Sequence, residues 1–333
     1  MQSVIDKIKK IDTILKEFKD DVEYSFWCPR DFTNPQGKGF TLYIYGGHVL
    51  DIFVDEAKNI YCKAFDKEYF PFFNEDRDEI EKAFLHLANC HSVNNIDVVL
   101  KWNTEIWKII FKALKNRAEN IDVQKNDKVY LERMRENAIV HKCSPIVKKG
   151  DDILMAVNIE ASIISSRGKV KPDMITIRMR KKIPIISYIE YKCTEGGIDG
   201  TDLKTHFEDM QSYYKDSSLV EKIKDYFERI MQLQGSNIDG IRWQHCKQEI
   251  VFLFSNVVKE TKDTKRELPI STIVSHIRKM EKSEVFPQNN VKADFIKFWI
   301  IKDEKSSIQN RKEFTYNELK VAVDEIMSKY FWV

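Results

Sequence analysis

The sequence has almost no net charge and no long apolar run, and each absence excludes a class of protein. Its 54 lysines and arginines nearly balance 52 aspartates and glutamates, which gives a formal net charge of +2. Overall charge therefore does not indicate a nucleic-acid-binding protein, and any surface of that kind must be local. No apolar run approaches the length that crosses a bilayer, so we expect no membrane partner.

The cysteines show no pairing in the sequence. The six of them form no CxxC pair, and they are Cys28, Cys62, Cys90, Cys143, Cys193 and Cys246. Free thiols in a reducing compartment explain this distribution better than zinc or disulfides. The N-terminal segment is amphipathic and carries acids, unlike a signal peptide, so we expect a cytoplasmic protein. A GxxxxGK[ST] motif is also absent, so a nucleotide-driven motor would have to be another polypeptide.

Length and pattern indicate two domains. The 333 residues, 43% of them apolar, suffice for two hydrophobic cores. Residues 1–122 predict a smaller α+β domain, with a hairpin around Gly46-Gly47 and with Trp102 and Trp107 in its core. We expect this domain to dock or sense a partner. A polar junction separates it from a second domain, which we assign to residues 123–333.

The second domain has the pattern of an α/β fold with a central mixed sheet. From about residue 128 the order is helix, three strands, helix and strand. β-Rich runs predict these strands at 153–164, 174–179, 185–193 and 250–254. Helices on both faces of a mixed sheet are the natural packing for this order, and the chain as a whole is then α+β.

The stretch 171–192 contains the candidate site residues. It consists of two predicted strands joined by a basic turn. Glu190 and Lys192 lie two residues apart, so both side chains project from one face of their strand. Asp173 begins the preceding strand and meets Glu190 if the two strands pair. Two carboxylates and the carbonyl of Tyr191 are hard oxygen ligands, which favour Mg²⁺ or Mn²⁺. The alternative is a surface aspartate at a turn beside an edge-strand Glu/Lys pair.

These residues resemble the signature of the PD-(D/E)xK nuclease superfamily. Pro172-Asp173 and Glu190-Tyr191-Lys192 carry the resemblance. It implies a restriction-endonuclease-like core of helix, three-stranded meander, helix and strand. It also implies that Asp173 and Glu190 are metal ligands and that Lys192 is the catalytic lysine, beside a metal-bound water that attacks the phosphate.

The resemblance implies further site residues. RecB-like members carry a glutamine and a tyrosine on the helix after the third strand, so the resemblance implies that Gln211 is a catalytic residue. The alternative is that Gln211 is an ordinary exposed residue of that helix. Many members add an acid from the first core helix, and here Glu136 is preferred over Glu132, while both can also be solvated helix charges. Glu160 on the first strand is a further candidate metal ligand. Tyr213 and Tyr214, in contrast, are expected to pack in the core, with Tyr214 on one apolar stripe of the helix.

The sequence thus predicts a magnesium-dependent endodeoxyribonuclease, with Mn²⁺ able to substitute for Mg²⁺. The expected partner is DNA, contacted through basic residues of 178–182. Such nucleases often serve in restriction or antiphage (antiviral) defence. Two further expectations are a helicase or ATPase as partner protein and the formation of a homodimer. The alternative is a non-catalytic nuclease-like module that binds nucleic acid or a partner protein in a defence or repair complex, although the intact motif argues against it.

Overall fold

The chain divides into two compact units in a computed structural model. The N-terminal unit comprises residues 1–141 and 224–237, and the C-terminal unit comprises residues 142–223 and 238–333. The structure describes residues 2–18, 24–27, 39–45, 47–54, 57, 59–64, 78, 81–83, 85, 95–119, 147–149, 152–159, 163–165, 168–170, 172–194, 200–215, 218–233, 235, 238–260, 265–267, 295–301, 308, 311–315 and 318. The predicted boundary at 122/123 lies outside these residues.

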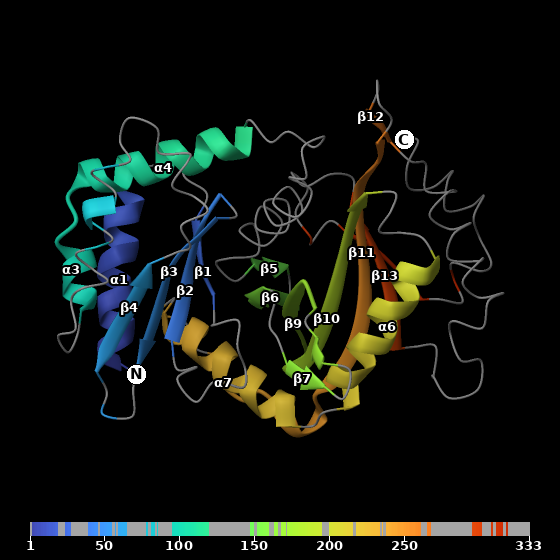
Figure 1. The fold of residues 1–333 in the computed structure, drawn as a ribbon. Coiled ribbons are helices and arrows are strands. Elements are labelled where there is room, and N and C mark those ends of the chain that lie inside the picture. Colours follow the sequence, from blue (N-terminus) through green and yellow to red (C-terminus); the bar gives the residue numbers. More distant parts are fainter. Residues whose placement is uncertain are drawn as a thin grey trace. The chain divides into compact units, whose positions relative to one another are not determined.

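The N-terminal unit contains one antiparallel sheet, three described helices from residues 1–141 and the part of α7 (Ser218–Leu233) that begins at Lys224 (Figure 1). The strands follow one another in sheet order as β1 (Tyr24–Trp27), β2 (Gly39–Ile44), β3 (Gly47–Val54) and β4 (Ile60–Ala64). The helices are α1 (Gln2–Lys16), α3 (Ile96–Leu100) and α4 (Thr104–Glu119). The four strands are therefore consecutive in the chain and the helices stand before and after them, as expected for an α+β unit.

The predicted hairpin and the predicted tryptophan core are both confirmed. Ile44 pairs with Gly47, so the loop between β2 and β3 has two residues, and Tyr45 in it has a φ of 46°. Trp107 is fully buried and Trp102 is 7% exposed, with their ring centroids 5.3 Å apart. These two large side chains fill the interior of the unit rather than forming a base-stacking platform.

The edge strand β4 is joined to the segment before α3 by a buried asparagine. The side chain of Asn95 accepts a hydrogen bond from the backbone N–H of Cys62 and donates one to its carbonyl at 3.0 Å. Asn95 is only 6% exposed. Its amide therefore pairs with β4 much as a neighbouring strand would, which satisfies backbone groups that would otherwise be costly to bury.

The C-terminal unit is built on a mixed sheet, as predicted for an α/β fold (Figure 1). Its strand order is β14-β13-β11-β10-β9-β6-β5, and β12 pairs with β11. The strands are β5 (Val147–Lys149), β6 (Asp152–Ile159), β9 (Met174–Arg180), β10 (Ile183–Thr194), β11 (Lys247–Glu260), β12 (Lys265–Glu267), β13 (Ile296–Ile301) and β14 (Lys312–Thr315). β6, β9 and β10 are antiparallel neighbours, whereas β11 runs parallel to β10 and β13.

The strand predicted over 153–164 is interrupted. β6 ends at Ile159, and a separate hairpin of β7 (Ile163–Ser165) and β8 (Gly168–Val170) forms its own two-stranded sheet. The strand predicted over 250–254 is confirmed as a central one, since β11 lies between β10 and β13. Its residues from Ile250 to Phe254 are all fully buried, because both faces of the strand are covered.

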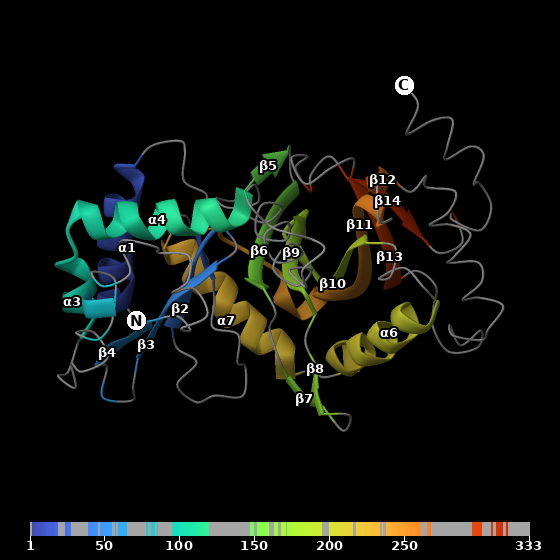
Figure 2. The same ribbon diagram turned by 45° about the horizontal axis from the view of Figure 1, so that its top comes forward.

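Two helices connect β10 to β11. They are α6 (Gly200–Lys215) and α7 (Ser218–Leu233), and a short 3-10 helix, η5 (Trp243–His245), precedes β11. α6 lies along β10 and β11 in both views (Figures 1 and 2). It buries Phe207, Met210 and Tyr213. Within the described parts of the chain, no helix combines the length and the apolar character needed to cross a membrane.

Candidate functional site

The pairing of β9 with β10 brings Asp173 to Glu190. The ladder runs from the pair Ile183–Arg180 to the pair Ile189–Met174, so Asp173 stands opposite Glu190 just beyond its last pair. The Asp173 carboxylate accepts a hydrogen bond from the backbone N–H of Tyr191, with Oδ2 and N 2.7 Å apart. The predicted side-by-side pairing of the two strands is therefore confirmed, and it anchors Asp173 to the motif segment of β10.

Glu190 and Lys192 project from the same face of β10, as the strand period predicts, and form an ion pair. Lys192 Nζ lies 2.7 Å from Glu190 Oε1, and the two side chains are 8% and 3% exposed. Ile189 and Tyr191 point to the opposite face and are fully buried. A single buried charge would be very costly, so each member of this pair holds the other in place.

α6 adds a third polar group to the pair, His206. Its Nδ1 lies 2.9 Å from Glu190 Oε1, and its Nε2 lies 3.3 Å from Lys192 Nζ. A neutral ring with its proton on Nδ1 satisfies both contacts, because Nδ1–H then donates to Glu190 and Nε2 accepts from the lysine ammonium. The His206 side chain is 31% exposed, so it is the solvent-accessible member of a hydrogen-bonded ring of three.

Sequence reasoning missed His206. His206 directly precedes Phe207, which α6 buries against the sheet. A polar residue beside a buried one on this helix was the signal in the sequence that could have indicated it. Gln211, the residue that the resemblance suggested, is half-buried on α6 and makes no hydrogen bond to Glu190 or Lys192. It lies five residues beyond His206, about 140° around the helix, which places it on another face. α6 therefore brings His206, not Gln211, to the pair.

The two tyrosines after Gln211 differ in environment. Tyr213 is fully buried, with its ring centroid 5.4 Å from that of Tyr188 on β10. Tyr214 is half-buried and stacks on Phe295 at 4.4 Å. The predicted core packing is thus confirmed for Tyr213, whereas Tyr214 is only half-buried because the buried stripe of α6 passes through Phe207, Met210 and Tyr213.

The carboxylates meet the requirements of a magnesium ion in part. The described residues hold no cluster of three or more histidine, cysteine, aspartate or glutamate side chains suited to a metal. Mg²⁺, however, commonly uses one or two protein carboxylates and keeps several waters, and Asp173 and Glu190 supply that number on one face. The side chain of Tyr191 lies on the other face, so only its backbone can serve the site. Glu132, Glu136 and Glu160 lie outside the described residues.

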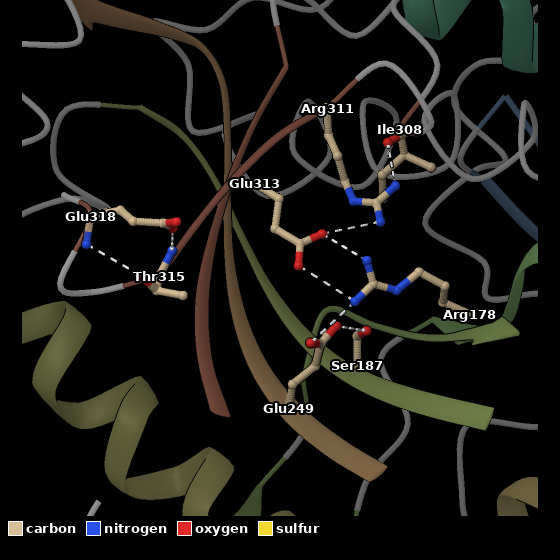
Figure 3. A network of polar contacts seen from close by, with 8 residues as sticks. All are labelled: Arg178, Ser187, Glu249, Ile308, Arg311, Glu313, Thr315 and Glu318. Carbon is tan, nitrogen blue, oxygen red and sulfur yellow. Dashed lines mark hydrogen bonds and ion pairs between the residues drawn. The ribbon is translucent and has the colours of Figure 1, made fainter. Parts of the chain in front are cut away.

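A second polar network lies on the opposite face of the same sheet (Figure 3). Arg178 NH1 contacts Glu313 Oε2 at 2.8 Å, and its NH2 lies 3.5 Å from Glu249 Oε2. Ser187 donates a hydrogen bond of 2.6 Å to Glu249. The Arg178 side chain is 15% exposed. The sequence predicts a phosphate contact for the basic residues of 178–182, but the Arg178 guanidinium is instead held by two carboxylates.

Glu249 is the most perturbed acid of this network. Burial raises its pKa above the ordinary range, and the nearby Arg178 guanidinium and the Ser187 hydroxyl only partly offset that effect. Arg311 extends the network, since it contacts Glu313 at 3.4 Å and lies over the Trp299 ring at 4.1 Å. Figure 3 shows these side chains gathered over neighbouring strands. The network bridges β9, β10, β11 and β14, which indicates a structural role in holding the sheet together.

Comparisons with protein-family models, with curated proteins and with solved structures gave no match. A function for the chain therefore has to be inferred from the geometry of Asp173, Glu190, Lys192 and His206.

Proposed function

We propose that the C-terminal unit is a metal-dependent nuclease with a restriction-endonuclease-like core. The observation that carries the proposal is that the Asp173 carboxylate is bound to the backbone of Tyr191, between the ion-paired Glu190 and Lys192, at one end of the β9–β10 ladder. The order of elements supports it, because the antiparallel strands β6, β9 and β10 are followed by helices and by the parallel strand β11. That order is the one the superfamily resemblance implies.

In this proposal Asp173 and Glu190 hold a magnesium ion, with Mn²⁺ as a substitute. The bound cation would supply Lewis acidity toward a phosphate and lower the pKa of a coordinated water. Asp173 is already oriented by the N–H of Tyr191, so one of its oxygens has a fixed direction. Glu190 Oε1 is held in place by Lys192 and His206.

Lys192 supplies positive charge beside the two carboxylates. Its buried ammonium would stabilise negative charge that develops on the phosphate, in a setting where water competes poorly. Loss of one preorganised donor of this kind typically lowers the rate by a hundredfold or more. The proposed substrate is DNA, and restriction or antiphage defence is the proposed setting by association with the fold.

Cleavage assays with matched aspartate variants test the proposal. Plasmid, linear duplex, single-stranded DNA and RNA are incubated with Mg²⁺, with Mn²⁺ and with chelator. Asp173→Asn keeps an acceptor for the Tyr191 N–H but removes the charge, so it should abolish metal-dependent cleavage. Asp51→Asn is the control, because Asp51 also accepts a hydrogen bond of 2.7 Å, from Thr41, and contacts His48 at 2.9 Å, but lies in the N-terminal unit. Equal cleavage by wild type and Asp173→Asn would refute the nuclease assignment.

A non-catalytic binding module is the second candidate, and one observation favours it. Glu190 Oε1 already has two partners, Lys192 and His206, which compete with any cation for that oxygen. A module of this kind would bind nucleic acid or a partner protein without metal-dependent cleavage. The same assays separate the two candidates, since this one predicts DNA binding in chelator and no cleavage with either metal.

A further inference from the structure

A group of exposed basic residues lies at the other end of β10 from Glu190. We call it the basic end surface, and it consists of Arg180, Lys181, Lys182, Arg242 and Lys247, all of them exposed. It joins two segments distant in the sequence. The backbone N–H of Arg242 donates to the Lys182 carbonyl at 2.9 Å, and its guanidinium donates to the Lys181 carbonyl at 3.0 Å. The β9–β10 hairpin tip is therefore fixed against the loop before β11.

The two lysines of the hairpin tip occupy positions that favour other residues. Lys181 and Lys182 have φ values of 49° and 63°, in the left-handed region where glycine and asparagine are preferred. Such a backbone costs on the order of 1 kcal/mol for each ordinary residue. Lysine at both positions brings two positive charges to the tip at that cost.

The basic end surface has little neutralising charge. Segment 178–187 contains no acid, and segment 238–248 contains one, Asp239. On the neighbouring strand β6, the register places Asp152 opposite Arg180. Among the described side chains, Lys181, Lys182 and Lys247 have no carboxylate partner. Cations clustered in this way repel one another in the free protein, and this arrangement suits a polyanion that neutralises several of them together.

The position of the surface relative to Glu190 follows from the strand. Ile183, the first residue of β10, and Glu190 are seven residues apart, which corresponds to about 23 Å of extended chain. That span equals about seven base pairs of duplex DNA at 3.4 Å each. The surface is therefore remote from the proposed reaction centre but lies on the same unit and the same strand.

We propose that the basic end surface binds the phosphate backbone of DNA about seven base pairs from the cleaved bond, and this location rests on the proposed function. The contacts are to phosphates, so the surface adds affinity without reading the base sequence. An anionic membrane is the competing polyanion. The only exposed large apolar side chain among the described residues is Leu85, in the N-terminal unit, so the surface offers no apolar side chain for insertion into lipid.

Binding measurements without metal test the surface independently of cleavage. Fluorescence anisotropy follows a labelled 20-base-pair duplex in chelator over a range of salt concentrations. The test variant is Lys181→Asn/Lys182→Asn/Lys247→Gln, since asparagine tolerates the left-handed backbone and Arg242 is left to hold the tip. The control is Lys101→Gln/Lys112→Gln/Lys115→Gln, which removes the same charge from exposed lysines of the N-terminal unit.

The test variant should bind the duplex at least about tenfold more weakly than wild type, with the salt slope reduced by about 2.7, or 0.9 for each lost phosphate contact. The control should match wild type, and circular dichroism should be unchanged in both. Equal binding by all three proteins, or an equal loss in both variants, would overturn the proposal. So would a loss of binding to phosphatidylserine vesicles with DNA binding intact, because the surface would then serve membranes.

A cleavage arm distinguishes failure of this inference from failure of the nuclease assignment. Wild type should reach full kcat/KM only when about seven or more base pairs flank the cut on one side. In the test variant, longer flanks should no longer lower KM, so kcat/KM should not depend on duplex length, and kcat should equal that of wild type. If the chain cleaves nothing, the anisotropy result still decides whether the surface binds DNA.

Discussion

Lys192 Nζ lies 2.7 Å from Glu190 Oε1, and both side chains are almost completely buried. Breaking a buried pair by removing one partner typically costs about 3–5 kcal/mol, because the other charge is left without compensation. We therefore expect Lys192→Met to destabilise the C-terminal unit by about 3 kcal/mol. Glu190→Gln/Lys192→Met should recover most of that loss, since it leaves no buried charge. Denaturant unfolding, monitored by hydrogen exchange in peptides from β10 and β11, measures the loss in the single variant and the recovery in the double variant. Additive losses in the double variant would contradict the pairing.

His206 contacts the same oxygen of Glu190 that the lysine contacts, so it competes with a cation for that oxygen. His206→Ala should tighten Mn²⁺ binding about fivefold, the equivalent of one hydrogen bond of about 1 kcal/mol. Isothermal titration calorimetry on the full chain measures the affinity directly. Thr205→Ala, an exposed neighbour on α6, is the control and should leave it unchanged. Weaker Mn²⁺ binding by the histidine variant would instead make His206 a ligand.

The pKa of Glu249 is raised by burial, and this gives the C-terminal unit a pH-dependent stability. A raised carboxyl pKa means that the folded state holds the proton more tightly than the unfolded state. Stability is therefore lost as the pH rises from about 4.5, the ordinary value, through the folded-state pKa. The loss is about 1.4 kcal/mol per pH unit within that window.

Glu249→Gln removes this proton while keeping an acceptor for the Ser187 hydroxyl. The difference in unfolding free energy between wild type and variant should shift in favour of the variant across the window and then become constant. Denaturation at a series of pH values measures it. A difference that does not change with pH would show that Glu249 titrates normally in the folded protein.

Asn95 makes two hydrogen bonds to the backbone of Cys62 on the edge strand β4. Asn95→Ala leaves those buried backbone groups without their partner, so it should destabilise the N-terminal unit by about 1–3 kcal/mol. The exchange of the Cys62 amide should accelerate, as measured by hydrogen–deuterium exchange. Asn103→Ala, which removes only an exposed hydrogen bond to the Ile106 N–H, should leave the Cys62 amide protected.

Sequence periodicity predicted the local part of the site correctly. The alternation along β10 placed Glu190 and Lys192 on one face, and the burial of Ile189 and Tyr191 follows from the same period. Thr315 and Glu318 have the spacing of a capping box in the sequence, and they form one, since Thr315 N–H donates to Glu318 Oε2 and Glu318 N–H donates to Thr315 Oγ1. These features depend on residues within a few positions of one another, so the backbone geometry of one element fixes them.

The sequence by itself thus indicated the central strands and which side chains share a face, although the strand predicted over 153–164 ends at Ile159. The tertiary structure alone decided which elements meet. It placed Asp173 opposite Glu190 through the register of β9, brought His206 to the pair through α6, and joined Arg242 to the hairpin tip. Strand register and helix docking follow from the burial of many distant apolar side chains together, and a local pattern does not contain that information.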